Sequence, residues 1–210
     1  MATIQGIVNP PSSTSAQDGA NPLVLQGKAG ELVKTDLHGK WYTAAYRGRV
    51  FSGSVAAVTL PTNASNLVSV FSLFNPANSP VNVELISLNW AYVVATTVVN
   101  GIGLYYQRIG GAVTIPTSQT AGTVTSGLVG NTASPQALFL SAATHVGTPT
   151  LGTIVGYTGA VTSTAANINQ YLFDGKFVLP PNTIVSVAMT TAASTASGFT
   201  GSLDWAEWPI

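Results

Sequence analysis

The clearest structural pattern lies near the end of the sequence, in Phe199-Thr200-Gly201-Ser202-Leu203-Asp204-Trp205-Ala206. Phe199, Leu203 and Trp205 share one phase of an alternation, and polar or small residues occupy the other phase. Successive side chains of a β-strand point to opposite faces, so this period of two predicts a strand with one buried face. We therefore expect the Trp205 indole to lie in the core.

The same alternation occurs upstream, in Val185, Val187 and Met189 and in the stretch that begins at Val81. Turns rich in Pro, Asn and Gly separate the candidate strands, because these residues favour tight reversals of the chain. Their spacing of about 8–15 residues predicts an antiparallel all-β sandwich or barrel. About nine strands are expected, over residues 50–59, 67–74, 81–94, 102–109, 138–146, 153–161, 171–179, 185–190 and 199–206.

Two parts of the sequence are ambiguous. Val33, Leu37, Trp41 and Ala45 recur at helical spacing, but Gly39 interrupts them. For residues 30–47 a short helix and a strand both remain open, and we favour an extended conformation. Residues 117–132 and 191–197 are tracts rich in Ser, Thr, Gly and Ala that predict loops or polar strands.

The first ~30 residues are rich in Pro, Ser, Gly and Asn and show no period. Such a segment buries too little apolar surface to offset its own ordering entropy. We predict an extended N-terminal arm over residues 1–35, followed by a single β-sandwich domain over residues 36–210. Two small apolar clusters of the arm are available to dock on a neighbouring chain.

Charged residues are scarce, with 7 basic and 7 acidic side chains among 210 residues and a net charge of zero. Charged residues make up about 25% of an average domain, against 7% here. Neutrality leaves no basic surface for nucleic acid or an anionic membrane, so neither is an expected partner. Residues 109–173 carry no charge at all. Because charge normally keeps a domain soluble and monomeric, its absence favours a homo-oligomer.

The sequence contains few of the residue patterns that are typical of catalytic or metal-binding sites. The sequence has only His38 and His145 as candidate bases, no cysteine and no Gly-x-Ser-x-Gly motif. Asp36 and His38 share a face if their segment is a strand, which makes them the best candidate for a metal-ligand pair. Asp204 and Glu207 are three residues apart, so on a strand they point to opposite faces and do not form a glycosidase pair. We expect no enzymatic activity, no bound metal and no cofactor.

A family resemblance is carried by two parts of the chain. Residues 30–42, followed by Tyr46-Arg47-Gly48 and Val50-Phe51, resemble a lead segment of virion structural proteins from tailed bacteriophages. Residues 177–183 and 202–209 resemble the last two strands of jelly-roll capsid decoration proteins, in which a Pro-rich turn joins an apolar strand to the final one. The resemblance implies a jelly-roll-like antiparallel β-sandwich with an extended N-terminal arm. It also implies a non-enzymatic capsid decoration or cement protein at the capsid surface of a virion.

The implied partners are the major capsid protein or another virion protein, together with further copies of the chain, and a homotrimer is favoured. The predicted interface combines apolar clusters of the arm, aromatic and basic residues of the following segment, and one C-terminal tryptophan. Its members are Ile4, Ile7, Val8, Leu23, Val24, Leu25, Leu37, His38, Lys40, Trp41, Tyr42, Tyr46, Arg47, Arg49 and Trp208.

An alternative function is a tail-fibre, spike or head-fibre module that binds host-surface carbohydrate, which predicts exposed aromatic side chains in a row. A small hydrolase is a third reading, disfavoured by the few histidines and acids.

Overall fold

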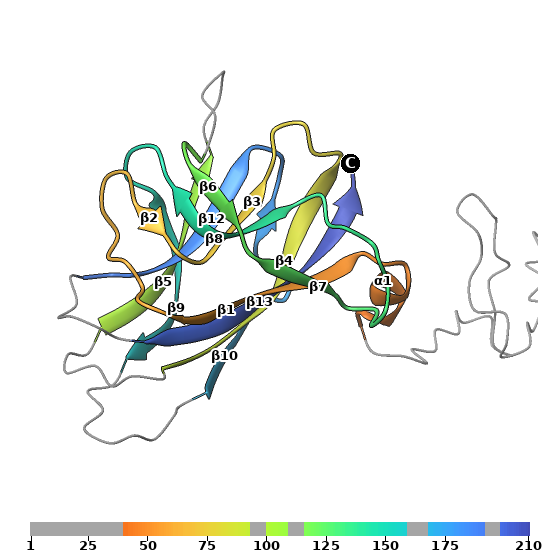
Figure 1. Cartoon of the computed structure of the whole chain (residues 1–210), viewed down its shortest axis with the longest axis horizontal. Coiled ribbons are helices and arrows are strands. Elements are labelled where there is room, and N and C mark those ends of the chain that lie inside the picture. The colour runs from red at the N-terminus through yellow and green to blue at the C-terminus, as the bar shows by residue number, and fades with distance from the viewer. Residues whose placement is uncertain (1–39, 93–99, 109–115, 159–167, 192–197) are drawn as a thin grey trace, which may run out of the picture. The chain divides into compact units, whose positions relative to one another are not determined.

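The computed structural model describes residues 40–92, 100–108, 116–158, 168–191 and 198–210 (Figure 1). Residues Thr43–Ile210 form one compact unit, and a separate unit ends at Tyr42. The predicted boundary between arm and sandwich, after residue 35, lies outside the described residues.

The described residues form one short helix and thirteen strands. The helix is α1 (Tyr42–Tyr46). The strands are β1 (Val50–Val58), β2 (Val68–Ser69), β3 (Ser72–Asn75), β4 (Val81–Tyr92), β5 (Asn100–Arg108), β6 (Gln119–Ala121), β7 (Thr123–Ser126), β8 (Leu138–Thr144), β9 (Thr150–Thr158), β10 (Ile168–Leu172), β11 (Val178–Leu179), β12 (Thr183–Met189) and β13 (Phe199–Pro209).

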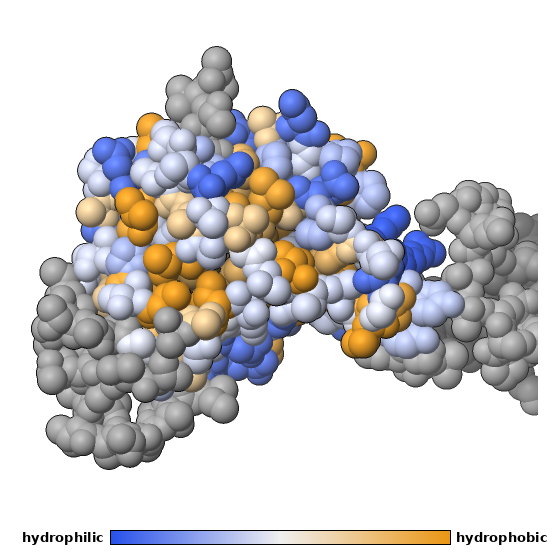
Figure 2. Space-filling view, in the orientation of Figure 1, coloured by the Kyte–Doolittle hydropathy of each residue, from blue (hydrophilic) through white to orange (hydrophobic). Residues whose placement is uncertain are grey.

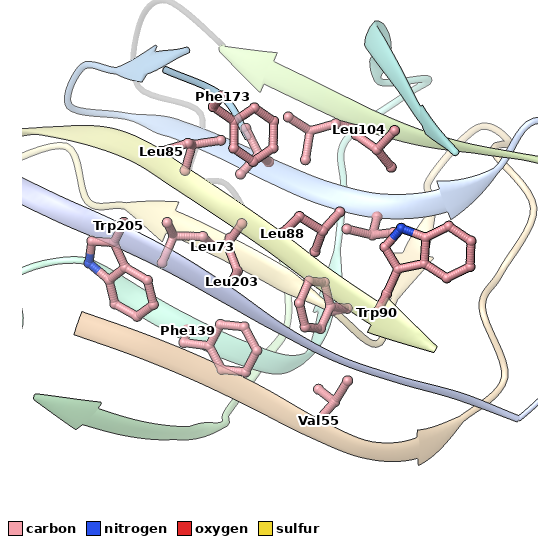
Figure 3. Close-up of a cluster of buried hydrophobic side chains, with 14 of the residues drawn as sticks. Val55, Leu73, Leu85, Leu88, Trp90, Leu104, Phe139, Phe173, Leu203 and Trp205 are labelled. Atoms are coloured by element: carbon pink, nitrogen blue, oxygen red, sulfur yellow. The ribbon is translucent and has the colours of Figure 1, made fainter. Parts of the chain in front are cut away.

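Hydrogen bonding assembles these strands into two antiparallel sheets. One sheet has the order β10-β4-β13-β1-β7, and β11 also pairs with β4. The other has the order β2-β8-β3-β12-β5-β9, and β6 also pairs with β8. The two sheets pack against each other around a shared apolar core (Figures 1 and 3). The predicted all-β sandwich is therefore confirmed.

The connectivity is that of a jelly roll. When β1, β3, β4, β5, β9, β10, β12 and β13 are numbered one to eight in chain order, the first sheet has the order 1-8-3-6 and the second 2-7-4-5. This arrangement is the double Greek key of a jelly roll. The strands β6, β7 and β8 come from the connection between β5 and β9, and they widen both sheets beyond the eight.

The core is built from the inward-facing side chains of both sheets. Figure 3 shows Leu88, Leu203 and Trp205 of one sheet directed toward Leu73 and Phe139 of the other. Trp205 is fully buried and stacks on Phe139, with ring centroids 6.4 Å apart. The predicted core position of Trp205 is therefore confirmed.

The long strand β4 changes phase in its middle. Val83 and Leu85 face the core in its first half, and Leu88 and Trp90 do so in its second half. The register with β13 passes from Trp205↔Leu85 to Asp204↔Ser87, so one extra residue of β4 forms a bulge. The bulge explains why this part of the sequence is nearly continuously apolar instead of alternating.

Two strands predicted as continuous are interrupted, and these predictions are wrong in detail. Residues 67–74 divide into β2 and β3 at Val70 and Phe71, where the Phe71 N–H donates to the Ser69 hydroxyl at 3.2 Å, while the Phe71 C=O still accepts the Val187 N–H at 3.0 Å. Residues 171–179 divide into β10 and β11 at a turn in which Asp174 and Gly175 have φ of 46° and 77°. The polar tract 117–132 contains two short strands, β6 and β7.

The extended conformation favoured for residues 30–47 is wrong where that segment is described, since residues 42–46 form α1. Ala44 and Ala45 favour a helix. The helix ends in a Schellman motif, in which the Gly48 N–H bonds Ala45 O at 2.9 Å and the Arg49 N–H bonds Ala44 O at 2.9 Å. Gly48 has φ of 69°, which a residue without Cβ adopts at little cost.

Candidate binding cavity and attachment surface

Eight of the predicted interface residues lie outside the described part of the chain: Ile4, Ile7, Val8, Leu23, Val24, Leu25, Leu37 and His38. The candidate ligand pair Asp36 and His38 lies outside it as well. In the unit that ends at Tyr42, the Lys40 ammonium stands 4.8 Å from the centroid of the Trp41 ring, and Tyr42 is exposed.

The other predicted interface residues belong to the sandwich and gather at one of its ends. The Schellman turn places α1, with Tyr46 and Arg47, directly before β1. Arg49 lies beside the end of β13, because its carbonyl accepts the Glu207 N–H at 2.9 Å. Trp208 follows on that strand. The start of β1 and the end of β13 therefore lie side by side, at an end of the sandwich that we name the attachment end (Tyr46, Arg47, Arg49 and Trp208).

A buried carboxylate fixes the backbone at the attachment end. Glu207 is 5% exposed. Its Oε2 accepts the Gln136 N–H at 2.9 Å, and its Oε1 accepts the Ala137 N–H at 2.9 Å and the Trp205 Nε1–H at 3.3 Å. The segment that leads into β8 is thereby held against β13. Asp204 lies on the opposite face of β13 and accepts from Ser87 and Asn89, so the two acids do not form a pair.

Two aromatic side chains are presented at the attachment end. Tyr46 is 57% exposed and Trp208 is 37% exposed. The Trp208 indole is oriented by a hydrogen bond from Nε1 to Glu84 Oε2 at 2.9 Å. A broad hollow of about 690 Å³ is lined by uncharged residues 124–135, and Asn131 of that lining packs against Gly48. The attachment end is thus aromatic and weakly polar, with two arginines.

Apolar groups emerge at many points of the sandwich surface. Exposed examples are Leu151 and Tyr157 of β9, Leu172 of β10 and Val178 of β11. On the face drawn in Figure 2, orange groups are interspersed with pale, weakly polar ones.

A second, smaller cavity opens where the two sheets meet near β9 and β11. Its volume is about 380 Å³, within the range of about 300–1,000 Å³ for small-molecule sites. Tyr106 of β5 and Phe177, which precedes β11, contribute aromatic lining, and Lys176 contributes an ammonium group. Further lining comes from Leu151, Gly152, Val178, Leu179, Thr183 and Val185.

The local sequence explains this opening. The Asp174-Gly175 turn takes the chain out of the sheet after β10, and only two residues of β11 rejoin β4. Gly152 of β9 has no side chain, and a Cβ there would lie 3.1 Å from the Phe177 ring and 3.3 Å from Tyr106 Cδ1. The glycine therefore lets the two aromatic side chains approach from opposite sheets.

One buried hydroxyl belongs to the lining of this cavity. Thr183 is 5% exposed, and its Oγ1 has no hydrogen-bond partner among the described residues. Buried polar atoms are normally hydrogen-bonded, so this hydroxyl is a candidate partner for a bound group. Asn75, which faces Thr183 across the β3–β12 ladder, is not part of the lining; it donates from Nδ2 to Val81 O at 2.9 Å and Leu179 O at 3.0 Å.

A buried polar network crosses the outer face of the second sheet. The Ser186 hydroxyl lies 2.6 Å from Ser72 Oγ and 2.6 Å from His145 Nε2, and His145 Nδ1 lies 3.2 Å from Gln107 Oε1. Gln107 also bonds the N–H and the C=O of Val146, which orients its amide. Gln107 Oε1 can only accept, so the proton of neutral His145 sits on Nδ1. Burial lowers the pKa of His145 to about 4.

The order Ser186, His145 and Gln107 has the connectivity of a nucleophile, a base and an orienting group. Ser186 and His145 are each 1% exposed, however, so a substrate has no access to the hydroxyl in this structure. The network fastens His145 and Val146, which follow β8, to Gln107 of β5 and Ser186 of β12.

No group of three or more His, Asp or Glu that could hold a metal is found among the described residues. Within the same residues, no helix is long and apolar enough to cross a membrane. Comparison with protein-family models, with curated proteins and with solved structures finds no match. The fold therefore defines the class of the protein, a jelly-roll β-sandwich, and functional arguments rest on its own surfaces.

Sequence reasoning missed the cavity and the buried network. Tyr106, Gly152, Phe177 and Thr183 come from four separate segments, and only the register of the strands brings them together. One signal was present, because Asp174-Gly175 is a turn dipeptide inside a stretch that was predicted as one strand.

Proposed function

We propose that the protein is a non-enzymatic structural component of a virus particle, a capsid decoration or cement protein that adheres to the capsid and to its own copies. The N-terminal arm and the attachment end contact the major capsid protein or a neighbouring copy. A homotrimer is the favoured assembly, and the capsid surface is the favoured location.

The observation that carries this proposal is the gathering of Tyr46, Arg47, Arg49 and Trp208 at one end of the sandwich. These residues come from opposite ends of the sandwich sequence, and the β1–β13 pairing places them together. Aromatic and arginine side chains are enriched where proteins bind one another, and Trp, Tyr and Arg dominate binding energies. A jelly roll with a scarcely charged surface is also suited to being covered by its neighbours.

Particle binding tests the proposal directly. Deleting residues 1–30 is expected to abolish binding to purified particles that lack this protein, while circular dichroism shows an unchanged β-sandwich. Trp208→Ala is expected to weaken binding by roughly tenfold or more, as for a central aromatic contact. Tyr157→Ala is the matched control, because Tyr157 is exposed on β9, outside the attachment end. Binding that survives both the deletion and Trp208→Ala would refute capsid adhesion.

A second candidate function is a module that binds host-surface carbohydrate. One observation favours it, the cavity with Tyr106 and Phe177 in its lining. This function predicts a row of exposed aromatic residues at a sheet face or loop rim. Tyr106 and Tyr157 lie on the neighbouring strands β5 and β9, whereas Trp208 lies on β13 of the other sheet and Tyr46 on α1, so these four residues do not share one sheet face. Retention of the intact protein on immobilised host-surface polysaccharide, with no retention on particles, would favour this function over capsid adhesion.

A further inference from the structure

We propose that the cavity between β9 and β11 binds one saccharide residue, with Tyr106 and Phe177 against the apolar face of the sugar ring and with Thr183 bonding one of its hydroxyls. This inference rests on the second candidate function and is independent of capsid adhesion. It assigns to that function a place on the molecule and a class of ligand.

The aromatic lining provides the first argument. Tyr106 is 40% exposed in β5, and Phe177 reaches the same space from the opposite sheet. Gly152 keeps the space between them free of a side chain. The face of an aromatic ring is electron-rich and attracts the weakly positive C–H groups that cover one side of a sugar ring. The cavity thus has the flat apolar wall that such a ligand requires.

The Thr183 hydroxyl provides the second argument. Thr183 lines the cavity, and its buried Oγ1 has no partner among the described residues. A purely apolar ligand would leave this hydroxyl without a hydrogen bond, which costs binding energy. A sugar hydroxyl can donate to Thr183 Oγ1 or accept from it.

Lys176, which also lines the cavity, predicts which saccharides bind most tightly. Its ammonium group favours a carboxylate or a hydroxyl at the outer side of the bound ring. We therefore expect glucuronic acid to bind more tightly than neutral glucose. Lys176→Gln is expected to remove that preference while neutral sugars keep their affinity.

The test is a titration of the full-length ¹⁵N-labelled protein, followed by NMR. The probes are the methyl glycosides of glucose, galactose, N-acetylglucosamine and glucuronic acid at millimolar concentrations. At least one of them is expected to shift the amide signals of Gly152, Phe177 and Thr183 saturably. Tyr106→Ala is expected to weaken that binding roughly tenfold, whereas Tyr157→Ala, the matched exposed tyrosine of β9, leaves it unchanged.

Thr183→Val separates a binding role from a structural one. Valine has the shape of threonine without the hydroxyl, so loss of a hydrogen bond to sugar is expected to weaken binding by about fivefold. The urea midpoint is expected to stay equal or rise, because the wild-type hydroxyl has no protein partner to lose.

Each outcome decides something. Weakened binding in Tyr106→Ala and Thr183→Val, with normal unfolding, supports the site. Sugar-induced shifts confined to other residues overturn the site but keep the carbohydrate function. If none of the four glycosides shifts the three amides, the site is wrong, and if none shifts any amide, the carbohydrate function fails as well. Capsid adhesion is judged separately, by the deletion of residues 1–30.

Discussion

Replacing Glu207 with glutamine tests the buried carboxylate at the attachment end. In the wild type its two oxygens receive three N–H donors, from Gln136, Ala137 and Trp205. Glu207→Gln turns one oxygen into an NH₂ group, so at least one buried donor faces another donor. The loss of one charge-assisted bond, about 1.5–3 kcal/mol, adds to about 1–3 kcal/mol for the unsatisfied donor. We expect a loss of about 2.5–6 kcal/mol in the free energy of unfolding.

Urea denaturation followed by circular dichroism measures this change. For a domain of this size the melting temperature falls about 2–4 °C per kcal/mol, so a decrease of roughly 10 °C is also expected. Hydrogen exchange gives a local readout, because the Gln136 and Ala137 amides should exchange faster in the variant. Glu84→Gln is the matched control, since half-exposed Glu84 accepts the Trp208 indole N–H and a glutamine oxygen can accept the same bond. A loss below about 1 kcal/mol for Glu207→Gln would refute the reasoning, since an essential acceptor costs more than that.

Three further predictions concern other parts of the sandwich. Burial lowers the pKa of His145 from 6.5 to about 4, so stability is full above pH 6.5 and falls by about 3 kcal/mol as the pH drops toward 4, at about 1.4 kcal/mol per pKa unit. His145→Gln should remove that component from urea midpoints measured across this range. Gly53→Ala places a Cβ 2.4 Å from the Phe139 ring and should cost about 1–3 kcal/mol in urea unfolding. Gly48→Ala, at φ of 69°, should cost about 1–2 kcal/mol in the same assay.

Each of these has a control or a contrary result. If the stability of His145→Gln depends on pH in the same way as that of the wild type, the assignment of a depressed pKa to His145 is contradicted. Ser54→Ala is the control for Gly53→Ala. Ser54 is on the outward phase of β1, so this change should leave the free energy of unfolding unchanged. A Gly48→Ala variant as stable as the wild type would mean that α1 does not need its Schellman ending.

Local patterns were enough to predict much of the fold. The alternation that ends in Trp205 predicts β13 and its buried face, because the side-chain period of a strand is a property of the backbone. The order of the strands in each sheet is harder to predict from the sequence, since strands that pair in a sheet, such as β1 and β13, lie far apart in the sequence. The predicted strand boundaries were wrong where a side chain took up a backbone N–H, as Ser69 does for Phe71, and where a turn with positive φ interrupted an apolar run, as at Asp174.

The class of fold and the scarcity of charge can be predicted from the amino-acid sequence, because strand periodicity and composition do not depend on contacts between distant segments. Which residues meet depends on the tertiary structure. It joined Arg49 to the end of β13, enclosed Glu207 with three donors, and set Tyr106 against Phe177 across the gap left by Gly152. The physical reason is that a site depends on strand pairing and sheet packing between distant segments. Those contacts are selected by burial of the whole core, which no short stretch of sequence encodes.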